Sequence, residues 1–458
     1  MMNQFSQKKI AVLGFGLEGQ DLCEFLLEKK AQITVFDKKE PEDLGKAFDK
    51  FKKQGIEFKL GNDYLKDGLV GYDFVFRSPG FSPLRPEIIA TQKEGTIISS
   101  ATKLFFEFCP GKIIGVTGTK GKGTTATLIY EILKKDLPAG RHGGKQVFLA
   151  GNVGQPMLSL LPQIKENDWV ILELSSFQLQ DLQKSPHIAV VLFVTSEHLN
   201  YHRDQDEYIQ AKANIVCHQQ KNDFAVLNAD DLISSSFAGL TPAQIYCFSR
   251  RKKVNGAYVE RGEIYLAGQK VGPVKDLKIR GVHNWDNVCA AVTAASLAGA
   301  SLDSIKKIVF SFQSLEHRLE KVRSLKGVSF YNDSFATTPE TTMAALKSFK
   351  QPVVLIAGGS EKGSDYTQLG KTIAVSSVKT LILVGQMAEK IKQATLVNGF
   401  QGKIIFRPSQ QMSKIVKLAW QKAKRGDVVL FSPGCASYDM FLDYKDRGFQ
   451  FKKYVKAL

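Results

Sequence analysis

The 458-residue sequence predicts an α/β protein of three domains in series, each built on a mostly parallel sheet with flanking helices. Short runs rich in Val, Ile and Phe alternate with amphipathic segments along most of the chain, which is the pattern of strands and crossover helices. Two glycine-rich turns each follow an apolar run and precede a helical segment, as phosphate-binding turns of α/β proteins do. The length exceeds that of one compact domain, so we expect two or three separate cores.

Composition argues against nucleic-acid, membrane and disulfide-rich classes. The formal charge is +17, but basic and acidic residues alternate, as in KKEPEDLGKAFDKFKKQ (38–54), which is typical of solvated helix faces. The basic excess would still favour anionic small substrates. Six cysteines are scattered without a C-x-x-C pair, and no apolar run approaches the ~20 residues of a membrane span. We therefore expect a cytoplasmic protein with no nucleic-acid partner and no membrane partner.

Residues 1–109 are predicted to form a Rossmann-like domain that ends at a Pro- and Gly-containing linker. GFGLEG (Gly14–Gly19) is a complete G-x-G-x-x-G between a strand and a helix, and Asp37 ends the next strand. The pattern fits a dinucleotide, but the same geometry would hold the diphosphate of a UDP-linked substrate. A tight turn that binds nothing is the remaining alternative. The predicted strands are IAVLGFG (10–16), QITVFD (32–37) and YDFVFRSPG (72–80), the last of which adds Ser78 and a glycine backbone.

Residues 110–315 are predicted to form a second α/β domain around the stretch GVTGTKGKGTT (115–125). A loop of this kind after a strand and before a helix points successive N–H groups at an anion, and Lys122 would reach the β- and γ-phosphates of a nucleotide. Gly123 stands where such loops place a magnesium-binding Ser or Thr, so Thr124 or Thr125 is the local candidate for that hydroxyl. The other predicted elements are strands 113–118, 168–176, 188–195 and 223–228, a hairpin at 257–268 and a helix at 284–300.

Three further residues of this domain are candidates because of where they stand. Glu173 is an acid in the apolar strand ILELSS, which is costly to bury without a cation. His198 follows another strand, and Lys212 lies in the helical segment EYIQAKANI. Taken singly, the histidine and the lysine are more often solvated surface residues. The carboxyl ends of parallel strands meet at one edge, so these residues gain interest as a group.

Residues 316–458 are predicted to form a third, Rossmann-like domain. Its strands are expected at VSFYND (328–333), VVLIAGG (353–359), TLILVG (380–385) and DVVLFSPG (427–434).

Taken in order, the motifs of all three domains resemble the Mur ligase family, which extends the peptide of the bacterial cell-wall precursor, and its folylpolyglutamate synthase relatives. The resemblance rests on GFGLEG, RSPG, GTKGKGTT, GNVG, LELSSFQL, EHLNYH, the helix lysine, GVHNWDN, EHRLE, YNDS, AGGSEKGSDY and FSPGCASYDMFLDYKDRG, and it covers essentially the whole chain. Within the family, the motifs are most similar to those of the branch that adds glutamate to UDP-N-acetylmuramoyl-L-alanine.

The resemblance implies a role for each matching residue. Lys122, Glu173, His198 and Lys212 would be catalytic, and Thr124, Glu173, His198 and Lys212, the last as a carbamate, would bind two magnesium ions. The implied ATP site is Gly118, Thr119, Lys120, Gly121, Lys122, Gly123, Thr124, Asn284, Asn287, His317, Arg318 and Asp333. The implied UDP-substrate site is Gly14, Gly16, Leu17, Glu18, Asp37, Ser78, Pro79, Gly80 and Asn152. The implied amino-acid site is Lys362, Ser437 and Tyr444.

The resemblance therefore implies an ATP-dependent ligase that forms an acyl phosphate on the alanyl carboxylate and then an amide with glutamate, with the D-isomer favoured. We expect a monomer with small-molecule substrates only. Three positions depart from the family pattern: Gly123 in the phosphate loop, Phe335, which replaces a lysine in NDSFATTPET, and Tyr444, which replaces the usual Phe. The L-isomer, or another amino acid, remains an alternative. So do an NAD-dependent oxidoreductase built on GFGLEG and a non-catalytic nucleotide-binding protein.

Overall fold

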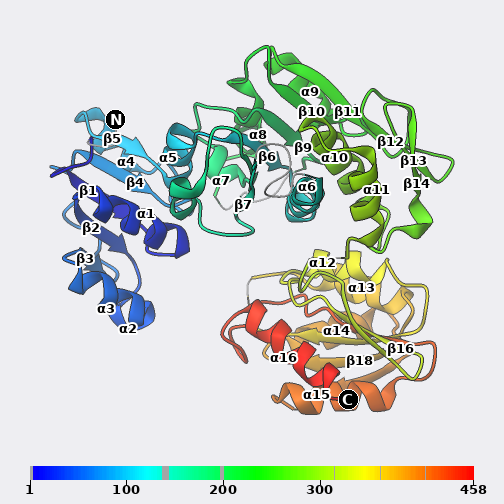
Figure 1. Cartoon of the computed structure of the whole chain (residues 1–458). Coiled ribbons are helices and arrows are strands. Elements are labelled where there is room, and N and C mark those ends of the chain that lie inside the picture. Colours follow the sequence, from blue (N-terminus) through cyan, green and yellow to red (C-terminus); the bar gives the residue numbers. More distant parts are fainter. Residues whose placement is uncertain (1–3, 137–143, 196–200, 314, 362, 408) are drawn as a thin grey trace. The chain divides into compact units, whose positions relative to one another are not determined.

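The computed structural model describes residues 4–136, 144–195, 201–313, 315–361, 363–407 and 409–458. Three large, mostly parallel sheets follow one another along the chain (Figure 1), which confirms the predicted fold class. The chain separates into two compact units. The first comprises Met1–Asp276 and Trp285–Phe310, and the second comprises Leu277–Asn284 and Ser311–Leu458. The predicted boundaries after residues 109 and 315 stay predictions.

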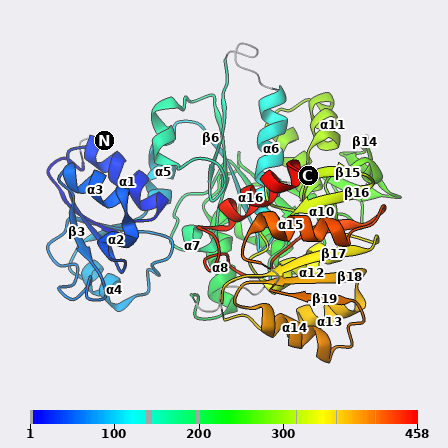
Figure 2. The same cartoon turned by 90° about the horizontal axis from the view of Figure 1, so that it is seen from below.

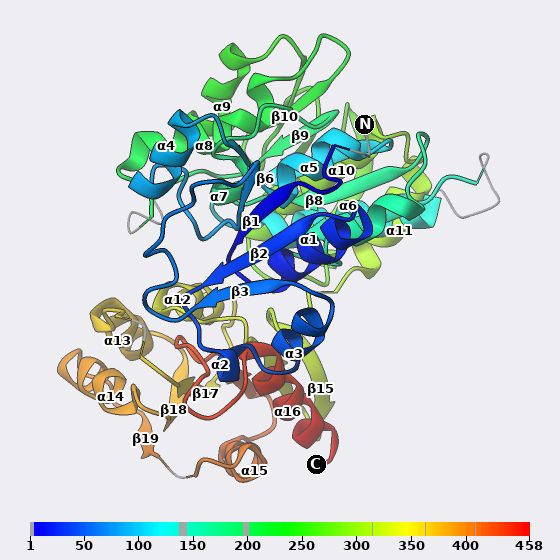
Figure 3. The same cartoon turned by 90° about the vertical axis from the view of Figure 1, so that its left-hand side faces the viewer.

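The first sheet is entirely parallel and has the strand order β3-β2-β1-β4-β5. Its middle strands carry buried residues toward both faces, as parallel strands covered by helices do. Figure 3 shows α1 beside β1 and β2. The elements are β1 (Lys9–Leu13), α1 (Leu17–Glu28), β2 (Gln32–Asp37), α2 (Pro41–Leu44), α3 (Lys46–Lys53), β3 (Glu57–Leu60), β4 (Phe74–Arg77), α4 (Pro86–Lys93), β5 (Ile97–Ser99) and α5 (Ala101–Phe108).

The second sheet is also parallel, with the order β11-β10-β9-β6-β8-β7. The predicted hairpin at 257–268 is confirmed as β12 and β13, and β14 adds a third strand that the sequence analysis did not anticipate. The strands are β6 (Lys112–Thr117), β7 (Val147–Gly151), β8 (Trp169–Glu173), β9 (Ile188–Val191), β10 (Phe224–Asn228), β11 (Gln244–Phe248), β12 (Ala257–Glu260), β13 (Glu263–Leu266) and β14 (Gln269–Pro273).

Helices pack on both faces of the second sheet. The predicted helix at 284–300 is confirmed as α10, which carries a nearly continuous run of small buried residues. The helices are α6 (Lys122–Asp136), η1 (Leu158–Gln163), α7 (Ser176–Leu179), α8 (Gln205–Cys217), α9 (Leu232–Ser236), η2 (Phe237–Leu240), η3 (Val274–Asp276), α10 (His283–Leu297) and α11 (Leu302–Ser311).

The third sheet, in the second unit, has the order β15-β16-β20-β17-β18-β19, and only the edge pair β15–β16 is antiparallel. One apolar core lies under α12, α13 and α14, and another lies under α15 and α16, which Figure 2 shows beside the strands. The elements are β15 (Glu320–Leu325), β16 (Val328–Asn332), α12 (Pro339–Leu346), β17 (Val353–Gly358), α13 (Thr367–Val375), β18 (Val378–Val384), α14 (Ala388–Val397), β19 (Lys403–Phe406), α15 (Met412–Lys422), β20 (Val428–Phe431) and α16 (Tyr444–Lys456).

Among the helices that the structure describes, none combines the length and the apolar character that a membrane crossing requires.

Gly19 lets α1 pack closely against the turn that follows β1, and this contact gives the first prediction. A Cβ at Gly19 would lie 2.1 Å from the Gly14 carbonyl oxygen. Alanine gains about 1 kcal/mol of helix propensity, whereas overpacking against backbone costs about 3 kcal/mol because no rotamer change relieves it. Gly19→Ala should therefore lower the unfolding free energy by roughly 2 kcal/mol in thermal or urea denaturation.

The matched control is Gly239→Ala, because Gly239 also lies in a helix but nothing stands within 4 Å of its added Cβ. Equal stability of the Gly19 variant and the control variant would contradict the close approach of α1 to the glycine turn.

Candidate active site

The phosphate loop joins the carboxyl end of β6 to α6, as the sequence predicts. Gly118 and Gly121 have φ angles of 143° and 92°, which favour glycine. The loop is held from the side by the segment after β9: the Thr119 N–H donates to the Phe193 carbonyl at 2.8 Å, and the Thr195 N–H donates to the Thr119 hydroxyl at 2.9 Å. Thr119 therefore fixes the loop through bonds within the protein, while Lys120 remains exposed.

Asn287 packs directly against this loop. A Cβ at Gly121 would lie 2.1 Å from the Asn287 Oδ1 atom, so only glycine allows the contact. Asn287 lies in the first turns of α10 and is buried. The structure thus brings a side-chain amide from a distant segment to the edge of the predicted phosphate site.

Two lysines converge on one carbonyl oxygen of the loop. Lys122 Nζ donates to the Gly118 and Thr119 carbonyls, each at 3.1 Å, and Lys212 Nζ donates to the same Gly118 oxygen at 2.9 Å. Lys212 is only 1% exposed, although a lysine on a helix is ordinarily solvated. The carbonyl dipole and the face of the Tyr208 ring, whose centroid lies 4.7 Å away, favour the buried ammonium group.

Tyr208 contacts the phosphate loop, and the sequence analysis did not identify it. Its hydroxyl lies 3.0 Å from the Thr119 hydroxyl, and it stands one helical turn before Lys212 on α8. The spacing of four residues was the available signal, because residues i and i+4 share one helix face. Asp204 caps the start of α8 by accepting a hydrogen bond from the Glu207 N–H.

Glu173 ends β8, beside the strand that leads into the phosphate loop. Its partner across the ladder is Val116, and its side chain is only 7% exposed. On the other side, the Asn152 N–H donates to the Glu173 carbonyl at 3.2 Å. A Cβ at Gly151 would lie 2.4 Å from that carbonyl oxygen, so glycine permits β7 to approach. The exposed Asn152 and the buried Glu173 thus lie at the same sheet edge as the phosphate loop.

Four residues are expected to bind magnesium, and the structure describes three of them. Thr124 retains slight exposure, whereas Thr125 has none, so Thr124 is the better hydroxyl candidate. His198 lies outside the described residues. Within the described ranges, no three His, Cys, Asp or Glu side chains group as a metal site. Glu173 ends the strand beside β6, Thr124 lies in the first turn of α6, and the Lys212 amine contacts the loop, where a carboxylated amine would provide the oxygen ligands that magnesium prefers.

The turn after β1 packs against the turn after β4. A Cβ at Gly14 would lie 2.4 Å from the Ser78 hydroxyl oxygen, and the Ser78 N–H donates to the Leu13 carbonyl at 2.9 Å. Asp37 accepts hydrogen bonds from the Phe15 N–H at 2.7 Å and the Lys39 N–H at 3.0 Å. The acid therefore holds the glycine turn, and its expected contact with a ligand stays a prediction. Pro79 and Gly80 follow at the rim, where Gly80 is exposed.

Leu17 and Glu18 follow Gly16, which precedes α1, and they have opposite environments. Leu17 is among the most exposed apolar side chains of the described residues. Burial raises the pKa of Glu18 to about 7, against the opposing influence of the Arg77 charge. The Glu18 side chain faces the protein rather than solvent.

The predicted residues of the second unit also gather. His317 is only 3% exposed, has a φ of 64°, and its Nδ1 lies 2.8 Å from Asn332 Nδ2. Burial lowers the pKa of His317. Asp333 accepts from the Ser432 hydroxyl at 2.7 Å and from the Leu319 N–H at 3.0 Å. Both residues lie at the carboxyl end of β16, where a parallel sheet presents its ligands.

Phe335, which departs from the family pattern, supports an aromatic and cationic cluster. The Arg318 guanidinium lies 3.9 Å from its ring centroid, and the Tyr444 ring meets it edge-on at 5.1 Å. The Tyr444 ring also lies edge-on to His317 at 6.2 Å. The structure therefore brings the predicted nucleotide residue Arg318 and the predicted amino-acid residue Tyr444 into contact with the same phenyl ring.

The loop that carries Ser437 is tied to the loop after β17. The Ser360 N–H donates to the Ala436 carbonyl at 3.0 Å, and the Tyr438 N–H donates to the Ser360 hydroxyl at 3.1 Å. Lys362 itself lies outside the described residues. Asn284, assigned to the nucleotide site, donates to the Arg280 carbonyl in this unit.

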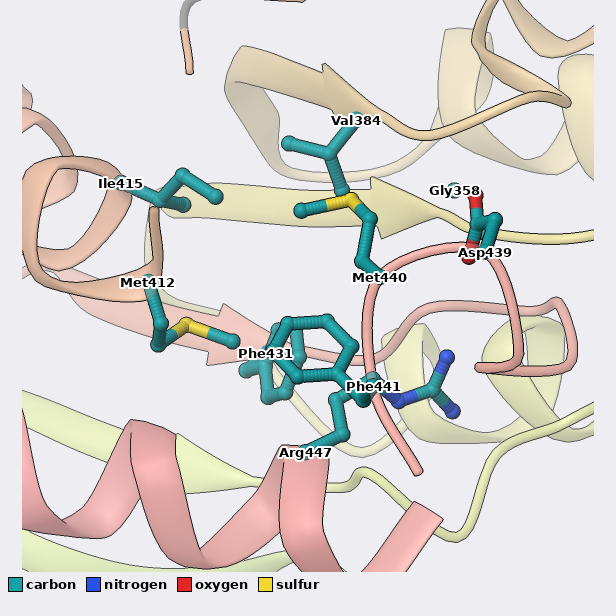
Figure 4. Close-up of a pocket in the computed structure, with 10 residues that line it drawn as sticks. Gly358, Val384, Met412, Ile415, Phe431, Asp439, Met440, Phe441 and Arg447 are labelled. Carbon is teal, nitrogen blue, oxygen red and sulfur yellow. The ribbon is translucent and has the colours of Figure 1, made fainter. Parts of the chain in front are cut away.

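Arg447 joins the loops after β16 and β20. Its guanidinium donates to the carbonyl oxygens of Ser334, Cys435 and Ala436 and to the Ser334 hydroxyl. Figure 4 shows Arg447 and Asp439 beside an apolar pocket lined by Met412, Ile415, Phe431, Met440 and Phe441.

A phosphate-binding loop with two lysines, and an α/β architecture with three mostly parallel sheets in series, define a nucleotide-dependent enzyme of the P-loop class. The family model for the Mur ligase middle domain matches residues 116–295, the MurD-like N-terminal domain matches 8–100, and the Mur ligase glutamate ligase domain matches 317–435. A UDP-N-acetylmuramoylalanine–D-glutamate ligase of Acetivibrio thermocellus is 41% identical, with 99% of this chain and 97% of the relative covered. One of Clostridium botulinum is 38% identical, with 98% and 97% covered. The chain belongs to the Mur ligase family.

Solved structures share the fold at low sequence identity. The UDP-N-acetylmuramate-alanine ligase of Thermotoga maritima has a TM-score of 0.61 at 18% identity, with 98% of this chain and 99% of that chain covered. The MurF ligase of the same organism, in complex with ADP, has a TM-score of 0.56 at 20% identity, with 100% and 97% covered.

The buried carboxyl of Asp333 gives a prediction about pH. Burial raises the pKa of Asp333 to about 7 from its ordinary value of 3.8, more than the Ser432 and Leu319 hydrogen bonds lower it. The folded state thus favours the protonated acid. The stability that protonated Asp333 contributes is fully present below about pH 4, and it is lost as the pH rises through 7. The thermal midpoint of the wild-type protein should therefore fall between pH 5 and pH 8 by more than that of Asp333→Asn.

Asp427→Asn is the control, because Asp427 is a buried acid of the same unit that is paired with Lys379. Identical pH slopes for the wild-type protein and Asp333→Asn would contradict the raised pKa.

Proposed function

We propose that this protein is an ATP-dependent ligase that joins the carboxyl group of UDP-N-acetylmuramoyl-L-alanine to the amine of D-glutamate during peptidoglycan precursor synthesis. Relatives with this printed name match nearly the whole chain. The structural observation that carries the proposal is the convergence of Lys122 and Lys212 on the Gly118 carbonyl, beside the end of the strand that bears Glu173.

ATP would bind with its phosphates at the loop between β6 and α6. Lys122 folds back onto two loop carbonyls, and bound phosphate would draw its ammonium toward the β- and γ-phosphates. Asn287 borders the same loop, which supports a contact between its side chain and the nucleotide. From the second unit, His317, Arg318 and Asp333 are assigned to the nucleotide by the resemblance.

Two magnesium ions are part of the proposal, with Thr124, Glu173, His198 and carbamylated Lys212 as their protein ligands. The position of Lys212 at the phosphate loop supports the carbamate, because a carboxylate on this nitrogen would supply oxygen ligands for magnesium beside the phosphates. Bound magnesium would neutralise phosphate charge and polarise the transferring phosphoryl group. Glu173, buried at the strand end, would gain the cationic partner that a buried carboxylate requires.

The chemistry explains why a cluster of cations is needed. A carboxylate is a poor electrophile, so the γ-phosphoryl group is first transferred to the alanyl carboxylate to give an acyl phosphate. The amine of glutamate then attacks its carbonyl carbon, and phosphate leaves. Both steps gather negative charge, which Lys122 would stabilise in a site that excludes water. The UDP moiety would lie at the turns bearing Gly14, Gly16 and Ser78.

The amino-acid site is proposed at Lys362, Ser437 and Tyr444 in the second unit. Phe335 replaces a lysine near this site, and the Arg318 guanidinium stacked on its ring keeps a positive charge beside it. That charge supports an acidic amino acid as the acceptor. We further propose that the protein works in the cytoplasm as a monomer, where ATP and UDP-linked precursors are present.

The defining test compares D- and L-glutamate in one phosphate-release assay with ATP and UDP-N-acetylmuramoyl-L-alanine. We expect release that requires all three substrates and a kcat/KM at least 100-fold higher for D-glutamate. Omission of each substrate is the control. Turnover with L-glutamate alone would reassign the isomer, and no turnover with either would overturn the function.

The proposed carbamate leads to a separate prediction about the substitution of Lys212. Lys212→Ala should lower kcat by on the order of 100-fold or more, because a ligand that stabilises transition-state charge is lost. Added acetate or formate should restore part of the activity by replacing the missing carboxylate. Lys221→Ala, at an exposed lysine beyond the same helix, is the control and should retain activity. Full activity of the Lys212 variant without added acid would remove the carbamate from the mechanism.

A further inference from the structure

Arg77 is buried within the first unit and makes a bonding pattern that the sequence analysis did not anticipate. It is the last residue of β4, only 1% of it is exposed, and its guanidinium serves three partners. It donates to the Phe81 carbonyl at 3.1 Å, to the Phe177 carbonyl at 3.2 Å, and to both carboxylate oxygens of Asp181. One side chain therefore links the first sheet to the segment that follows β8.

On the first-sheet side, Arg77 braces the turn Ser78–Phe81. The Phe81 N–H closes this turn on the Ser78 carbonyl at 2.9 Å, and Arg77 binds the carbonyl at its far end. Because Ser78 packs against Gly14, the braced turn forms one wall beside the glycine turn of β1. A change in the position of Arg77 would move that wall.

On the other side, Arg77 binds the carbonyl of Phe177 in α7, four residues after Glu173. The Phe177 ring packs on the rings of Tyr201 and His202, with centroids 4.2 Å and 5.6 Å away. The His202 Nε2 atom lies 3.0 Å from the Ser176 hydroxyl. This short helix therefore connects the end of β8 with the residues Tyr201 and His202.

The charges around Arg77 favour a fixed position for it. Lys103 of α5 also binds Asp181, with its Nζ atom 2.9 Å from Oδ2, so the carboxylate is shared by two cations. Burial by itself would raise the pKa of Asp181, but the Arg77 and Lys103 charges hold that pKa below its usual range. Glu18 and Tyr201 also face the guanidinium, and burial raises the pKa of Tyr201 to about 12. A buried guanidinium with this many hydrogen bonds is oriented rigidly.

We propose that Arg77 is a positioning residue that couples the two halves of the first unit's active site, by locking the Ser78–Phe81 turn to the segment Phe177–Asp181. The proposal rests on the proposed function, in which that turn frames the UDP-linked substrate and the segment follows a metal-binding strand end. The guanidinium sets the distance between the substrate's nucleotide end and its reacting carboxylate. Arginine is required because its planar fork reaches three partners at once, whereas a lysine ammonium reaches one or two.

The test measures steady-state kinetics of the full chain for Arg77→Met, Arg77→Lys and Asp181→Asn. We expect the KM for UDP-N-acetylmuramoyl-L-alanine to rise at least 10-fold in Arg77→Met, with the KM values for ATP and glutamate changed less than 2-fold. Arg77→Lys and Asp181→Asn should show smaller rises in the same KM. Asp181→Asn is nearly isosteric and keeps the contacts of Arg77 to both carbonyls, so it remains informative if Arg77→Met does not fold.

Arg85→Met is the matched control, because Arg85 follows the same turn, lies over the Phe81 ring and pairs with Glu87 inside the first-sheet domain. It should leave all three KM values within 2-fold. Equal KM values for the UDP substrate in Asp181→Asn, Arg77→Lys and the wild-type protein would overturn the proposal, as would equal rises for all three substrates. If the wild-type protein forms no amide at all, the proposed function fails instead.

Discussion

The central position of β6 is the constraint on which the site of the first unit depends. This strand pairs with β8 on one side and β9 on the other, and the chain fills the side of β7 and β8 before it crosses β6 to the side of β9, β10 and β11. A parallel sheet leaves a crevice at such a reversal, at the carboxyl ends of its strands. The phosphate loop leaves β6 there, Glu173 ends β8 there, and the segment after β9 holds Thr119 by hydrogen bonds. The pairing order of three strands thus determines which side chains meet.

Sequence patterns predicted those parts of this arrangement that are formed by short, continuous segments of the chain. The glycine loops, the strand that carries Glu173 and the hairpin at 257–268 follow from periodicity and turn chemistry within short windows. Tyr208 and Arg77 could not be found in the same way, because their roles come from partners 89 and 104 residues away along the chain. Nothing in the windows around them encodes those contacts. The motif GFGLEG shows a second limit of local patterns. It is complete, but it fits a nicotinamide cofactor as well as a UDP-linked substrate, so it does not identify the ligand.

Buried cations recur wherever two loops must be held together. Lys212 binds a loop carbonyl, Arg77 binds two carbonyls and a carboxylate, and Arg447 binds three carbonyls and a hydroxyl. Leaving such a charge unpaired in the interior would cost several kcal/mol, so each position tolerates little displacement of its partners. The arginines use a rigid fork with many donors, which suits loops that keep one geometry. The lysine has a single nitrogen whose protonation can change, which suits a group that is proposed to become a carbamate.

The cluster around Phe335 extends this reasoning to substrate choice. A lysine at that position would place its own charge at the end of a flexible stem, whereas Phe335 holds the Arg318 guanidinium against a ring that is fixed in turn by Tyr444. Phe335 removes the lysine charge from the loop after β16, and Arg318, which the EHRLE motif already supplies, is the positive charge that lies beside the ring. Guanidinium groups are more weakly hydrated than ammonium groups and lie flat on aromatic faces, so this arrangement costs less desolvation than a buried lysine. Under the proposed function, the Arg318 guanidinium would therefore be a group beside Phe335 that can attract an acidic substrate.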